Sequence, residues 1–590
     1  MPLPRDLPQR PDERVLRQLM ESLIFEGIVP VRQSAADGYF LFDWSHDRRP
    51  ENRPGQGGAR VDFRCRGKIG VFGRPRLIAG SVAMRTCNSG WTVATLEAVV
   101  AGLPGPAVNR ERLLGEMQQT IAFCRQNEET TMVRDRREMS LAEMEGALDE
   151  GHPYHPCFKA RTGFSTADHQ AYGPESGKSF QLVWLAVARR HVRQALPCHE
   201  ADFWLSELGP QVWDTLQRKR DALGLTADDF GLVPLHPWQW TNLGPSLLLP
   251  WIDAGEAHFL GALGDCYTAT QSIRTLMNAS RPMAANVKLP MSLVNTSSRR
   301  ILEPHSVCTA PVISAWISGI VADDSLFNTR YPLTILREYA GIIADGEGDL
   351  TGQIGAIWRD SAQATLGPGE AIVPFNALMM MEADGRPFAD DWILRHGLMP
   401  WLNRLIDIAV LPVWHLLVCH GIAVEAHGQN MLLVHRDGWP VRLVLRDFHE
   451  SIEFSPAFLR APDRMPDFSS LHADYRKAEP DQYYWTDNLD SLRELVMDTL
   501  FVYNMSEISH LLEQVYSLPE DRFWQRVEAC LAGYATENGM GCRQSLLGHT
   551  SPQTLTESLM TRKLFAQQPE YHHRVPNALA RDQAELRRKP

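Results

Sequence analysis

The strongest local constraint in this 590-residue chain is an Asp-Gly pair between two apolar runs. Residues 430–434 form the first run, residues 436–438 the polar interval and residues 441–445 the second run. Asp437-Gly438 is the kind of dipeptide that suits a tight turn with positive φ at both positions. The pattern therefore predicts a β-hairpin with strands over 430–434 and 441–445.

Polar residues stand at the open end of this hairpin. Glu425 and Asn430 lead into the first strand, and Asp447 follows the second. Since a hairpin brings those ends together, we expect the three side chains to converge, and their carboxylate and amide oxygens are ligands suited to Mg²⁺. The alternative is an ordinary polar hairpin base in which backbone groups satisfy each side chain.

The same spacing occurs in kinase-like phosphotransferases. There a catalytic Asp lies five residues before a metal-binding Asn, and a second metal-binding Asp opens an Asp-Phe-Gly-type motif after a hairpin. In this chain Glu425 lies five residues before Asn430, and Asp447-Phe448 follows the hairpin. The position of the base holds Glu, and the sequence has no Gly-rich phosphate loop before a Val-Ala-Ile-Lys strand. The comparison supports magnesium-nucleotide binding better than phosphoryl transfer to a hydroxyl.

A second group of polar residues is Ser272, Arg274 and Thr275. Two hydroxyls and a guanidinium within four residues suit phosphate oxygens, although a surface polar turn has the same composition. Lys288 follows in a strand-like run, and we expect it to lie beside the phosphates.

Arg299 and Arg300 end a polar run over residues 295–300. Consecutive residues of a strand point to opposite faces, so only one of the two arginines can reach the same pocket. The sequence leaves open which one it is.

A Gly-, Pro- and His-rich segment over residues 151–172 predicts an irregular loop. Four of its residues suit an anion-binding lid: His155, Lys159, Arg161 and Ser165. Zinc binding by His152, His155 and Cys157 is the competing interpretation, and the lack of a second ligand pair weighs against it.

Composition narrows the class of protein. The hydrophobic and charged fractions are 44% and 22%, typical of a soluble globular chain. A net charge of −12 argues against a dedicated nucleic-acid binder. Ten scattered cysteines fit a reducing compartment, and the most apolar stretch, residues 406–424, is interrupted by Asp, Pro and His. We expect a cytoplasmic protein without a membrane segment.

The expected elements alternate between helix and strand. The first part has a helix over 15–25, strands over 38–42, 59–63 and 68–72 with a turn between the last two, and a helix over 108–150. Helices over 179–196 and 200–223 and short strands over 230–302 follow. The rest is helix and loop over 310–421, with a helix over 400–419 kinked at Pro412, and a mostly helical region over 489–564. Changes of composition suggest boundaries near residue 151 and around 375–395.

Five motifs in a fixed order carry a family resemblance. They are Gly151-His-Pro-Tyr-His155-Pro-Cys-Phe-Lys159-Ala-Arg161-Thr-Gly-Phe-Ser165, His236-Pro-Trp-Gln239, Ser272-Ile-Arg274-Thr275, Glu425-Ala-His427-Gly-Gln429-Asn430 and Arg446-Asp-Phe-His449. Together they resemble the IucA/IucC family of siderophore synthetases, which act independently of nonribosomal peptide synthetases.

The resemblance implies an α/β (α+β) fold shaped like a cupped hand. Residues 1–150 are then an α/β thumb, 151–385 the fingers with the ATP phosphate-binding loops and strands, and 386–590 a palm with a kinase-like metal hairpin and a mostly helical C-terminal part. It also implies ATP-dependent activation of citrate or a citryl derivative as an acyl-adenylate. An amine or hydroxyl nucleophile then forms an amide or ester, with release of AMP and pyrophosphate, and the enzyme is a homodimer.

The resemblance assigns each motif residue an implied role. ATP is held by His155, Lys159, Arg161, Ser165, Ser272, Arg274, Thr275 and Lys288. The carboxylate substrate is held by Asn295, Thr296, Arg300, His427 and Gln429, of which Arg300 and His427 are catalytic. Mg²⁺ is held by Glu425, Asn430 and Asp447. The sequence does not decide whether His427 orients the acyl group or accepts a proton, nor which carboxylate and nucleophile are used.

Two other functions stay open. One is a kinase-like small-molecule phosphotransferase, which yields ADP in place of AMP and pyrophosphate. The other is a binding protein without catalysis, although all the polar site residues are present.

Overall fold

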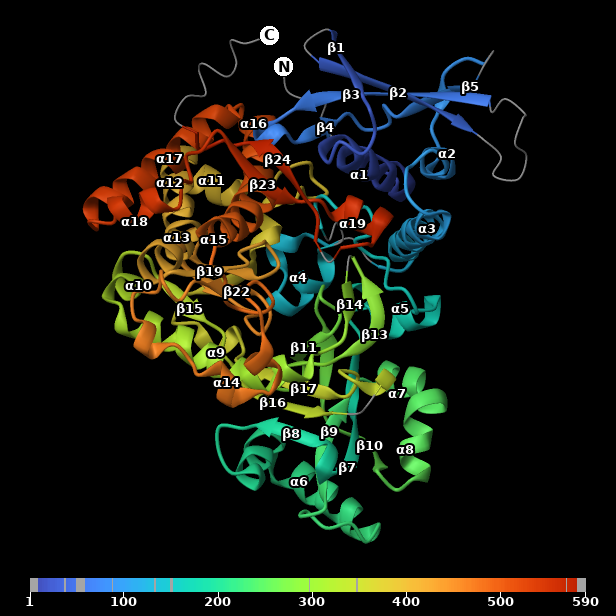
Figure 1. Cartoon of the computed structure of the whole chain (residues 1–590), viewed down its shortest axis with the longest axis vertical. Coiled ribbons are helices and arrows are strands. Elements are labelled where there is room, and N and C mark those ends of the chain that lie inside the picture. The colour runs from blue at the N-terminus through green and yellow to red at the C-terminus, as the bar shows by residue number, and fades with distance from the viewer. Residues whose placement is uncertain are drawn as a thin grey trace.

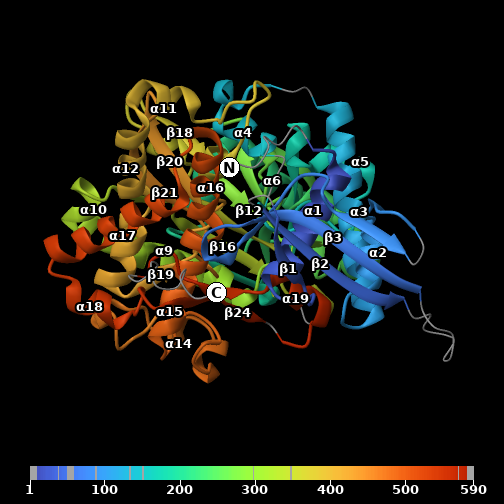
Figure 2. The same ribbon diagram turned by 90° about the horizontal axis from the view of Figure 1, so that it is seen from above.

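The computed structural model describes residues 9–36, 39–48, 59–86, 89–131, 134–148, 152–296, 298–345, 348–568 and 570–580. An N-terminal sheet and a larger central sheet lie at opposite ends of the view in Figure 1, with the C-terminal helices at its upper left. Figure 2 shows the N-terminal sheet beside the helical C-terminal part. The fold is mixed α/β, as the sequence predicts.

The N-terminal sheet is antiparallel and packs against helices. Its strands are β1 (Arg32–Ala36), β2 (Tyr39–Arg48), β3 (Ala59–Ile69), β4 (Pro75–Leu77), β5 (Ala83–Thr86) and β6 (Thr92–Val93). The neighbouring helices are α1 (Pro11–Phe25), α2 (Leu96–Ala101) and α3 (Ala107–Thr130). The predicted turn between strands 59–63 and 68–72 is wrong, since β3 runs through it. Val61, Phe63 and Cys65 are buried and the residues between them are half-buried, so a strand period continues where the polar residues suggested a turn.

The central sheet has eight strands in the order β8-β16-β17-β12-β11-β10-β7-β9. They are β7 (Ser179–Ala188), β8 (Val192–Ala195), β9 (Phe230–Leu235), β10 (Ala257–Ala269), β11 (Thr275–Asn278), β12 (Asn286–Lys288), β16 (Glu338–Ala344) and β17 (Gly355–Arg359). The predicted helix over 179–196 is wrong, because this segment forms β7 and β8. Residues 182–188 are all buried, and a strand buried on both faces loses the polar alternation that marks a strand in sequence. The predicted helix over 200–223 is confirmed as α6 (Glu200–Ala222).

The predicted hairpin is confirmed in a four-stranded sheet. The order is β15-β21-β20-β18, with β15 (Leu333–Ile335), β18 (Ala371–Pro374), β20 (Met431–Arg436) and β21 (Trp439–Leu445). Asp437 and Gly438 have φ of 47° and 83°, as a tight hairpin turn requires. A Cβ on Gly438 would lie 2.2 Å from Trp392 Cγ, so this position accepts only glycine. β15 and β18 lie in a region where only helix and loop were expected, and both precede the predicted boundary at residue 386.

The predicted helix over 400–419 is divided near Pro412. α12 (Leu398–Ala409) is followed by α13 (Leu411–His415) and by a π-helical turn, Leu416–His420. Proline has no N–H for the helical ladder, which accounts for the break at Val410.

Two helical segments have the length and apolar composition of membrane spans, α9 (Pro304–Asp323) and Leu398–His420. Within their most apolar windows, 56% and 83% of the residues are buried inside the protein. Because most of each window contacts protein, we interpret both as core helices.

The remaining elements connect these sheets. The helices are α4 (Leu141–Ala147), α5 (Thr166–Tyr172), α7 (Pro237–Leu243), α8 (Leu249–Asp253), α10 (Ser325–Thr329), α11 (Asp390–His396), α14 (Phe468–Leu471), α15 (Leu489–Val496), α16 (Ser506–Tyr516), α17 (Glu520–Glu537), α18 (Gly541–Leu546) and α19 (Leu559–Phe565). The strands are β13 (Met291–Asn295), β14 (Ser298–Arg300), β19 (Ile422–Val424), β22 (Ile452–Phe454), β23 (Gln553–Glu557) and β24 (His572–Pro576). The helix expected over 108–150 ends at Thr130, and α4 forms separately.

The C-terminal segment returns to the N-terminal helices, with α19 beside α3 in Figure 1. Glu26, just after α1, accepts hydrogen bonds from the backbone N–H groups of Met560 and Thr561 at 2.9 and 2.7 Å. The Lys563 ammonium contacts the buried Glu116 carboxylate of α3. These contacts hold the C-terminal segment against the N-terminal helices.

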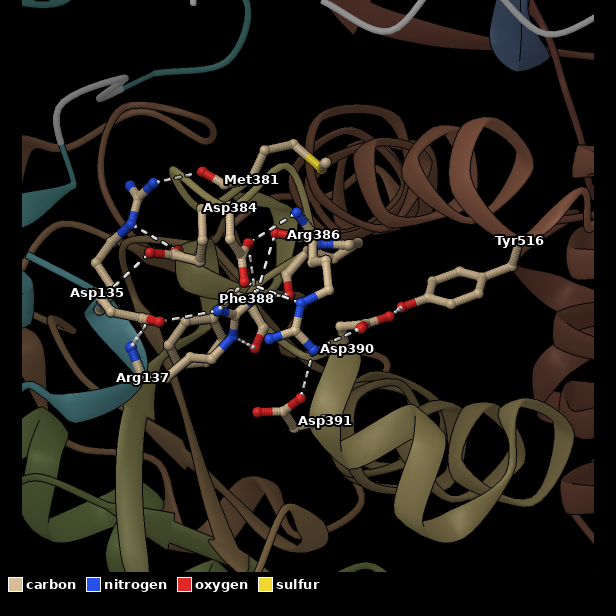
Figure 3. A network of polar contacts seen from close by, with 12 residues as sticks. Asp135, Arg137, Met381, Asp384, Arg386, Phe388, Asp390, Asp391 and Tyr516 are labelled. Carbon is tan, nitrogen blue, oxygen red and sulfur yellow. Dashed lines mark hydrogen bonds and ion pairs between the residues drawn. The ribbon is translucent and has the colours of Figure 1, made fainter.

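An exposed ion network joins the segment before α4 to the segment before α11 (Figure 3). Arg137 donates to Asp135 at 2.9 Å and to Asp384 at 3.0 Å. Arg386 donates to Asp384 at 2.9 Å and to Asp391 at 2.7 Å. The network joins residues 135–137 to residues 384–391.

Candidate active site

Two cavities adjoin at the open end of the β20–β21 hairpin. The smaller has a volume of about 210 Å³ and the larger about 580 Å³. Residues that line both are Arg300, Glu425, His427 and Gln429. The smaller cavity is also lined by Ser272, Arg274, Lys288, Asn430, Asp447, His449, Glu450 and Ser451. We call these the small cavity and the large cavity.

The hairpin holds the three predicted metal ligands at the small cavity. Asn430 leads into β20, and its Nδ2 donates to the Glu425 carbonyl at 3.1 Å. The Arg446 N–H donates to the Asn430 carbonyl at 3.0 Å, which closes the ladder just before Asp447. Glu425, Asn430 and Asp447 therefore converge as the hairpin pattern predicted, while metal binding by them stays a prediction.

Asp447 lies in a strained and highly polar position. Its φ is 76°, a left-handed conformation that a non-glycine residue adopts at a cost. The carboxylate contacts the Lys288 ammonium and lies 3.1 Å from His449 Nδ1. Burial opposes ionisation, but Lys288 and His449 outweigh it and hold the pKa of Asp447 well below its ordinary value.

Glu338 of β16 binds the backbone that follows Asp447. It is fully buried, and its Oε2 accepts the backbone N–H groups of Phe448 and His449 at 3.2 and 3.0 Å. Burial and Lys288 oppose a charge on His449, but Glu338 and Glu450 raise the pKa of His449 to about 9. The imidazole is thus held as a cation between carboxylates.

The turn between β10 and β11 supplies cationic and hydroxyl groups to the small cavity. Ser272 Oγ accepts the Thr275 N–H at 3.0 Å, and Ile273 has a φ of 68°. This tight turn places Ser272 and Arg274 on the cavity, and strand pairing of Thr275 with Lys288 brings the lysine beside them. Thr275 itself is buried and lies outside the lining of both cavities.

Arg300 stands where the two cavities meet. β13 and β14 pair as a short hairpin, and Arg300 Nη2 donates to the Asn295 carbonyl at 3.0 Å. Asn295 and Thr296 line the large cavity only. Burial, then Arg274, lowers the pKa of Arg300 to about 10, and burial lowers the pKa of His427 to about 4. The structure describes the Arg300 side chain at the site but not that of Arg299.

The four residues of the predicted lid do not line either cavity, although their loop neighbours His152, Pro153 and Phe158 line the large one. Lys159 Nζ and Arg161 Nη1 each lie 2.8 Å from the buried Glu175 carboxylate. His155 is buried, and its Nδ1 accepts the Cys157 N–H at 3.0 Å. Ser165 is an exposed N-cap whose Oγ accepts the Asp168 N–H at 3.1 Å. Direct contact of these four residues with ATP stays a prediction.

The loop does position β13. The Thr162 N–H donates to the Val294 carbonyl at 2.9 Å, and the Val294 N–H donates to Thr162 Oγ1 at 3.1 Å. The residue after Val294 is Asn295, so the loop supports one wall of the large cavity.

Seven carboxylates line the large cavity, and sequence reasoning missed all of them except Glu425. They are Glu425, Glu453, Asp481, Glu494, Asp498, Glu557 and Glu570. Burial and neighbouring carboxylates raise the pKa of Glu453 to about 7, and burial raises the pKa of Asp498 to about 8. Tyr483 and Trp485 lie in the same lining. We call these seven carboxylates the acidic wall.

Other missed residues have different origins. His449 and Glu450 stand within or beside a quoted motif, so their chemistry was visible although no role was assigned. Glu338 lies 110 residues from Phe448 in sequence and belongs to no motif, so only the fold reveals it. The members of the acidic wall are likewise scattered from residue 425 to residue 570.

The chemistry of the small cavity fits a hard cation. Glu425, Asn430 and Asp447 offer three oxygen donors, the type that Mg²⁺ prefers, and the Lys288 ammonium already contacts Asp447. Lys288 and His449 hold the pKa of Asp447 well below its ordinary value, whereas burial raises the pKa of Glu425 to about 7.

Comparison with known proteins identifies the family. Residues 140–380 match the model of the IucA / IucC family, and residues 399–585 match a model described as ferric iron reductase FhuF-like transporter. The citryl-spermidine/3,4-dihydroxybenzoyl-citryl-spermidine:spermidine ligase of Bacillus anthracis is 34% identical over 96% of this chain and 93% of its own. A Staphylococcus aureus synthase, named for 2-[(L-alanin-3-ylcarbamoyl)methyl]-3-(2-aminoethylcarbamoyl)-2-hydroxypropanoate, is 28% identical over 96% of this chain and 92% of its own.

A solved structure has the same fold. The petrobactin biosynthesis protein AsbB from Bacillus anthracis superimposes with a TM-score of 0.90 at 32% identity, covering 98% of this chain and 97% of that one. Similarity over nearly the whole length, together with the motifs at the two cavities, shows that this chain belongs to the IucA/IucC family of siderophore synthetases.

Proposed function

We propose that this protein is an ATP-dependent synthetase that activates a carboxylate of citrate or a citryl derivative as an acyl-adenylate and joins it to an amine. One observation carries the proposal: a small cavity lined by cations and oxygen donors opens into a larger one at Arg300 and His427. This is the arrangement expected when phosphates occupy one cavity, the acyl substrate the other, and the reaction takes place between them.

The small cavity suits the phosphates of ATP. Arg274, Lys288 and Ser272 provide charge-assisted and hydroxyl donors. Glu425, Asn430 and Asp447 line the same cavity and are the residues to hold Mg²⁺. When bound, the metal supplies Lewis-acid neutralisation of phosphate charge. Because the whole chain has a net charge of −12, the cations of the small cavity provide local positive charge where the anionic nucleotide would bind.

Arg300 and His427 line both cavities, which supports a role for them in the first chemical step. A substrate carboxylate oxygen attacks the α-phosphorus, the bond from that phosphorus to the bridging oxygen breaks, and pyrophosphate leaves. Negative charge gathers at the junction, where Arg300 stabilises it. Because burial holds the pKa of His427 to about 4, its imidazole is neutral at physiological pH and can donate or accept a hydrogen bond.

The acidic wall suits the amine substrate. The second step needs a neutral amine: its nitrogen attacks the acyl carbon, AMP leaves, and the nitrogen loses a proton. A polyamine can place its distal ammonium groups against the acidic wall while a terminal amine reaches Arg300 and His427, where positive charge favours the neutral form. We therefore propose a polyamine of the spermidine type, the nucleophile in the name of the 34% identical relative.

Product analysis tests the reaction. The full-length protein is incubated with ATP, Mg²⁺, citrate and a panel of mono-, di- and polyamines, and nucleotides and condensed products are identified by mass. AMP, pyrophosphate and a citryl amide in equal amounts are expected. ADP with a phosphorylated product would establish the kinase alternative, and no turnover of ATP with any partner would contradict both.

Binding of the amine is tested separately. Spermidine titrated into the protein without ATP should release protons, because an ammonium beside Glu453 and Asp498 lowers their raised pKa values. Calorimetry in buffers of different ionisation enthalpy measures that release. Glu453→Gln should weaken spermidine more than a monoamine, and exposed Glu479→Gln is the control. Equal weakening of both amines would remove the acidic wall from substrate binding.

A further inference from the structure

We infer a second, transition-metal site, remote from both cavities, formed by Asp324, His415, Cys419 and His420. One ligand atom from each residue lies within 4.8 Å of every other. None of the four residues lines either cavity, so the site is separate from the proposed magnesium site and does not depend on the proposed function.

The donors already converge on one point. His415 Nε2 and His420 Nε2 lie 3.1 and 2.9 Å from the same Asp324 oxygen, Oδ2. In a tetrahedral zinc site, with metal–ligand bonds of roughly 2.0–2.3 Å, neighbouring ligand atoms are roughly 3.3–3.8 Å apart. A small outward shift of these side chains therefore opens the space for an ion.

Local backbone structure explains why His415 and His420 face the same way. They are five residues apart, a spacing that an α-helix does not align, but residues 416–420 form a π-helical turn. The imidazole centroids are 5.4 Å apart. Gly421 ends the turn with a φ of 78°, and a Cβ there would lie 2.4 Å from the Phe458 carbonyl oxygen. Only glycine therefore fits at the end of this turn.

Two of the four residues, His415 and Asp324, make a second hydrogen bond outside the cluster, as ligands in metal sites commonly do. His415 Nδ1 is 2.8 Å from the buried Tyr534 hydroxyl, which directs Nε2 toward the cluster. Asp324 Oδ1 accepts the Leu326 N–H at 3.0 Å, which fixes the carboxylate and leaves Oδ2 for the cluster. Both ligands are thus oriented before any ion binds.

The donor set favours Zn²⁺ among common ions. Two imidazole nitrogens, one thiolate and one carboxylate are borderline and soft donors, unlike the oxygen donors of the small cavity. Binding forms one metal–sulfur, two metal–nitrogen and one metal–oxygen bond and releases the Cys419 thiol proton to solvent. Thiolate and carboxylate then neutralise the two charges of the ion.

An entry path is present. The Asp324 and His420 side chains are 13% and 12% exposed, whereas His415 is 1% exposed. Arg460 covers the cluster: its Nη1 lies 2.6 Å from Cys419 Sγ, and its side chain is 56% exposed. We expect Arg460 to turn outward into solvent when an ion replaces its positive charge.

Cobalt substitution tests the site. Full-length protein is stripped with a chelator and titrated with Co²⁺ without ATP. One equivalent should give the visible absorption of tetrahedral Co²⁺ together with a thiolate-to-cobalt charge-transfer band, and Zn²⁺ should abolish both. Less than about 0.2 equivalents bound, or an octahedral spectrum without the charge-transfer band, would overturn the proposal.

Variants locate the site. Cys419→Ser should lose the charge-transfer band. Tyr534→Phe removes a hydrogen bond to a ligand and should weaken Co²⁺ binding roughly ten- to hundredfold. His420→Gln removes a ligand itself and should weaken Co²⁺ binding by at least that much. Cys530→Ser is the matched control, a thiol 3.5 Å from Asp407 outside the cluster. Asp447→Asn should bind Co²⁺ normally. Circular dichroism checks folding, and His420→Gln remains informative if Cys419→Ser does not fold. An unchanged band in Cys419→Ser would refute the assignment.

Discussion

Two buried polar clusters in this protein contain the same kinds of side chain but face different surroundings. Around Glu175, Lys159 and Arg161 bind the carboxylate inside closed protein, and each of the Lys159 and Glu175 side chains is 1% exposed. Around Asp447, a lysine and a histidine bind a carboxylate that is 19% exposed and lines the small cavity.

The difference in exposure separates a cluster closed inside the protein from one whose polar groups face a cavity. In the closed cluster, two charge-assisted hydrogen bonds run from the Arg161 guanidinium to Glu175, both of 2.8 Å, so the carboxylate is already saturated. In the open cluster, the carboxylate sits at a residue with positive φ and shares a cavity with other oxygen donors. Residue types alone therefore did not distinguish a candidate ion-binding site from a buried structural ion pair, and the following variants test the distinction.

The largest effect is expected at the open cluster. Asp447→Asn keeps the shape of the side chain but removes its charge, and should lower pyrophosphate release by roughly a thousandfold or more, because the metal that neutralises the phosphates would lose an anionic ligand. The thermal midpoint should also fall, because the buried Lys288 and His449 lose an anionic partner, so turnover is compared on protein that circular dichroism shows to be folded. Exposed Asp214→Asn, which lies in an i,i+4 pair with Arg218, is the control. Normal turnover of folded Asp447→Asn would remove this residue from the reaction.

The closed cluster should respond in stability. Glu175→Gln leaves two buried cations facing a neutral amide, and removal of one partner of a buried ion pair costs about 3–5 kcal/mol. Urea unfolding measures this loss, with Glu13→Gln at an exposed pair as control. The protein that remains folded should keep its ATP affinity. A selective loss of ATP affinity at unchanged stability would instead restore the lid to the binding site.

The junction of the cavities should affect turnover more than binding. Arg300→Ala and His427→Ala should each reduce citrate-dependent pyrophosphate release by roughly a hundredfold, since they act on charge that develops in the transition state. ATP affinity measured without citrate should weaken less. Arg299→Ala is the companion variant. If it alone abolished activity, Arg299 would be the arginine that reaches the site.

Loss of a phosphate contact should be milder. Arg274→Ala removes a charged donor whose net contribution is about 1.5–3 kcal/mol, so ATP affinity should fall roughly tenfold or more. Equilibrium titration with a nonhydrolysable ATP analogue measures it. An unchanged dissociation constant would place the phosphates away from the β10–β11 turn.

The smallest effect is expected at the exposed network of Figure 3. Asp384→Asn removes a carboxylate that binds Arg137 and Arg386 at the surface, where solvent screens the charges. The urea midpoint and the turnover should both stay within experimental error. A large loss of either would show that the contact between residues 135–137 and 381–391 supports the site.

The parts of the fold that the sequence predicted well depend on local chemistry. Asp437-Gly438 determines its turn without help from distant residues, so the hairpin and the convergence of Glu425, Asn430 and Asp447 were predictable. β7 was mistaken for a helix because burial on both faces removes the alternation that identifies a strand.

The candidate site was predictable where motif residues line a cavity and not where distant elements complete it. The β10–β11 turn and Lys288 were found because they occur in polar clusters. Glu338 and the acidic wall were not, because they become neighbours only through the sheet order and the return of the C-terminal segment. The role of the lid residues in ATP binding stays a prediction, and the sequence did not reveal that Lys159 and Arg161 pair with Glu175.

The return of the C-terminal segment also has a consequence for synthesis on the ribosome. Glu26 and Thr561 are 535 residues apart. At about 5–20 residues per second, the carboxylate emerges roughly half a minute to two minutes before the groups that satisfy it. Throughout that interval the nascent N-terminal helices lack their final partners, and the large cavity lacks the wall that residues 555–572 provide. The large cavity can therefore be completed only at the end of translation, and until then the early chain exposes surface that the finished protein buries.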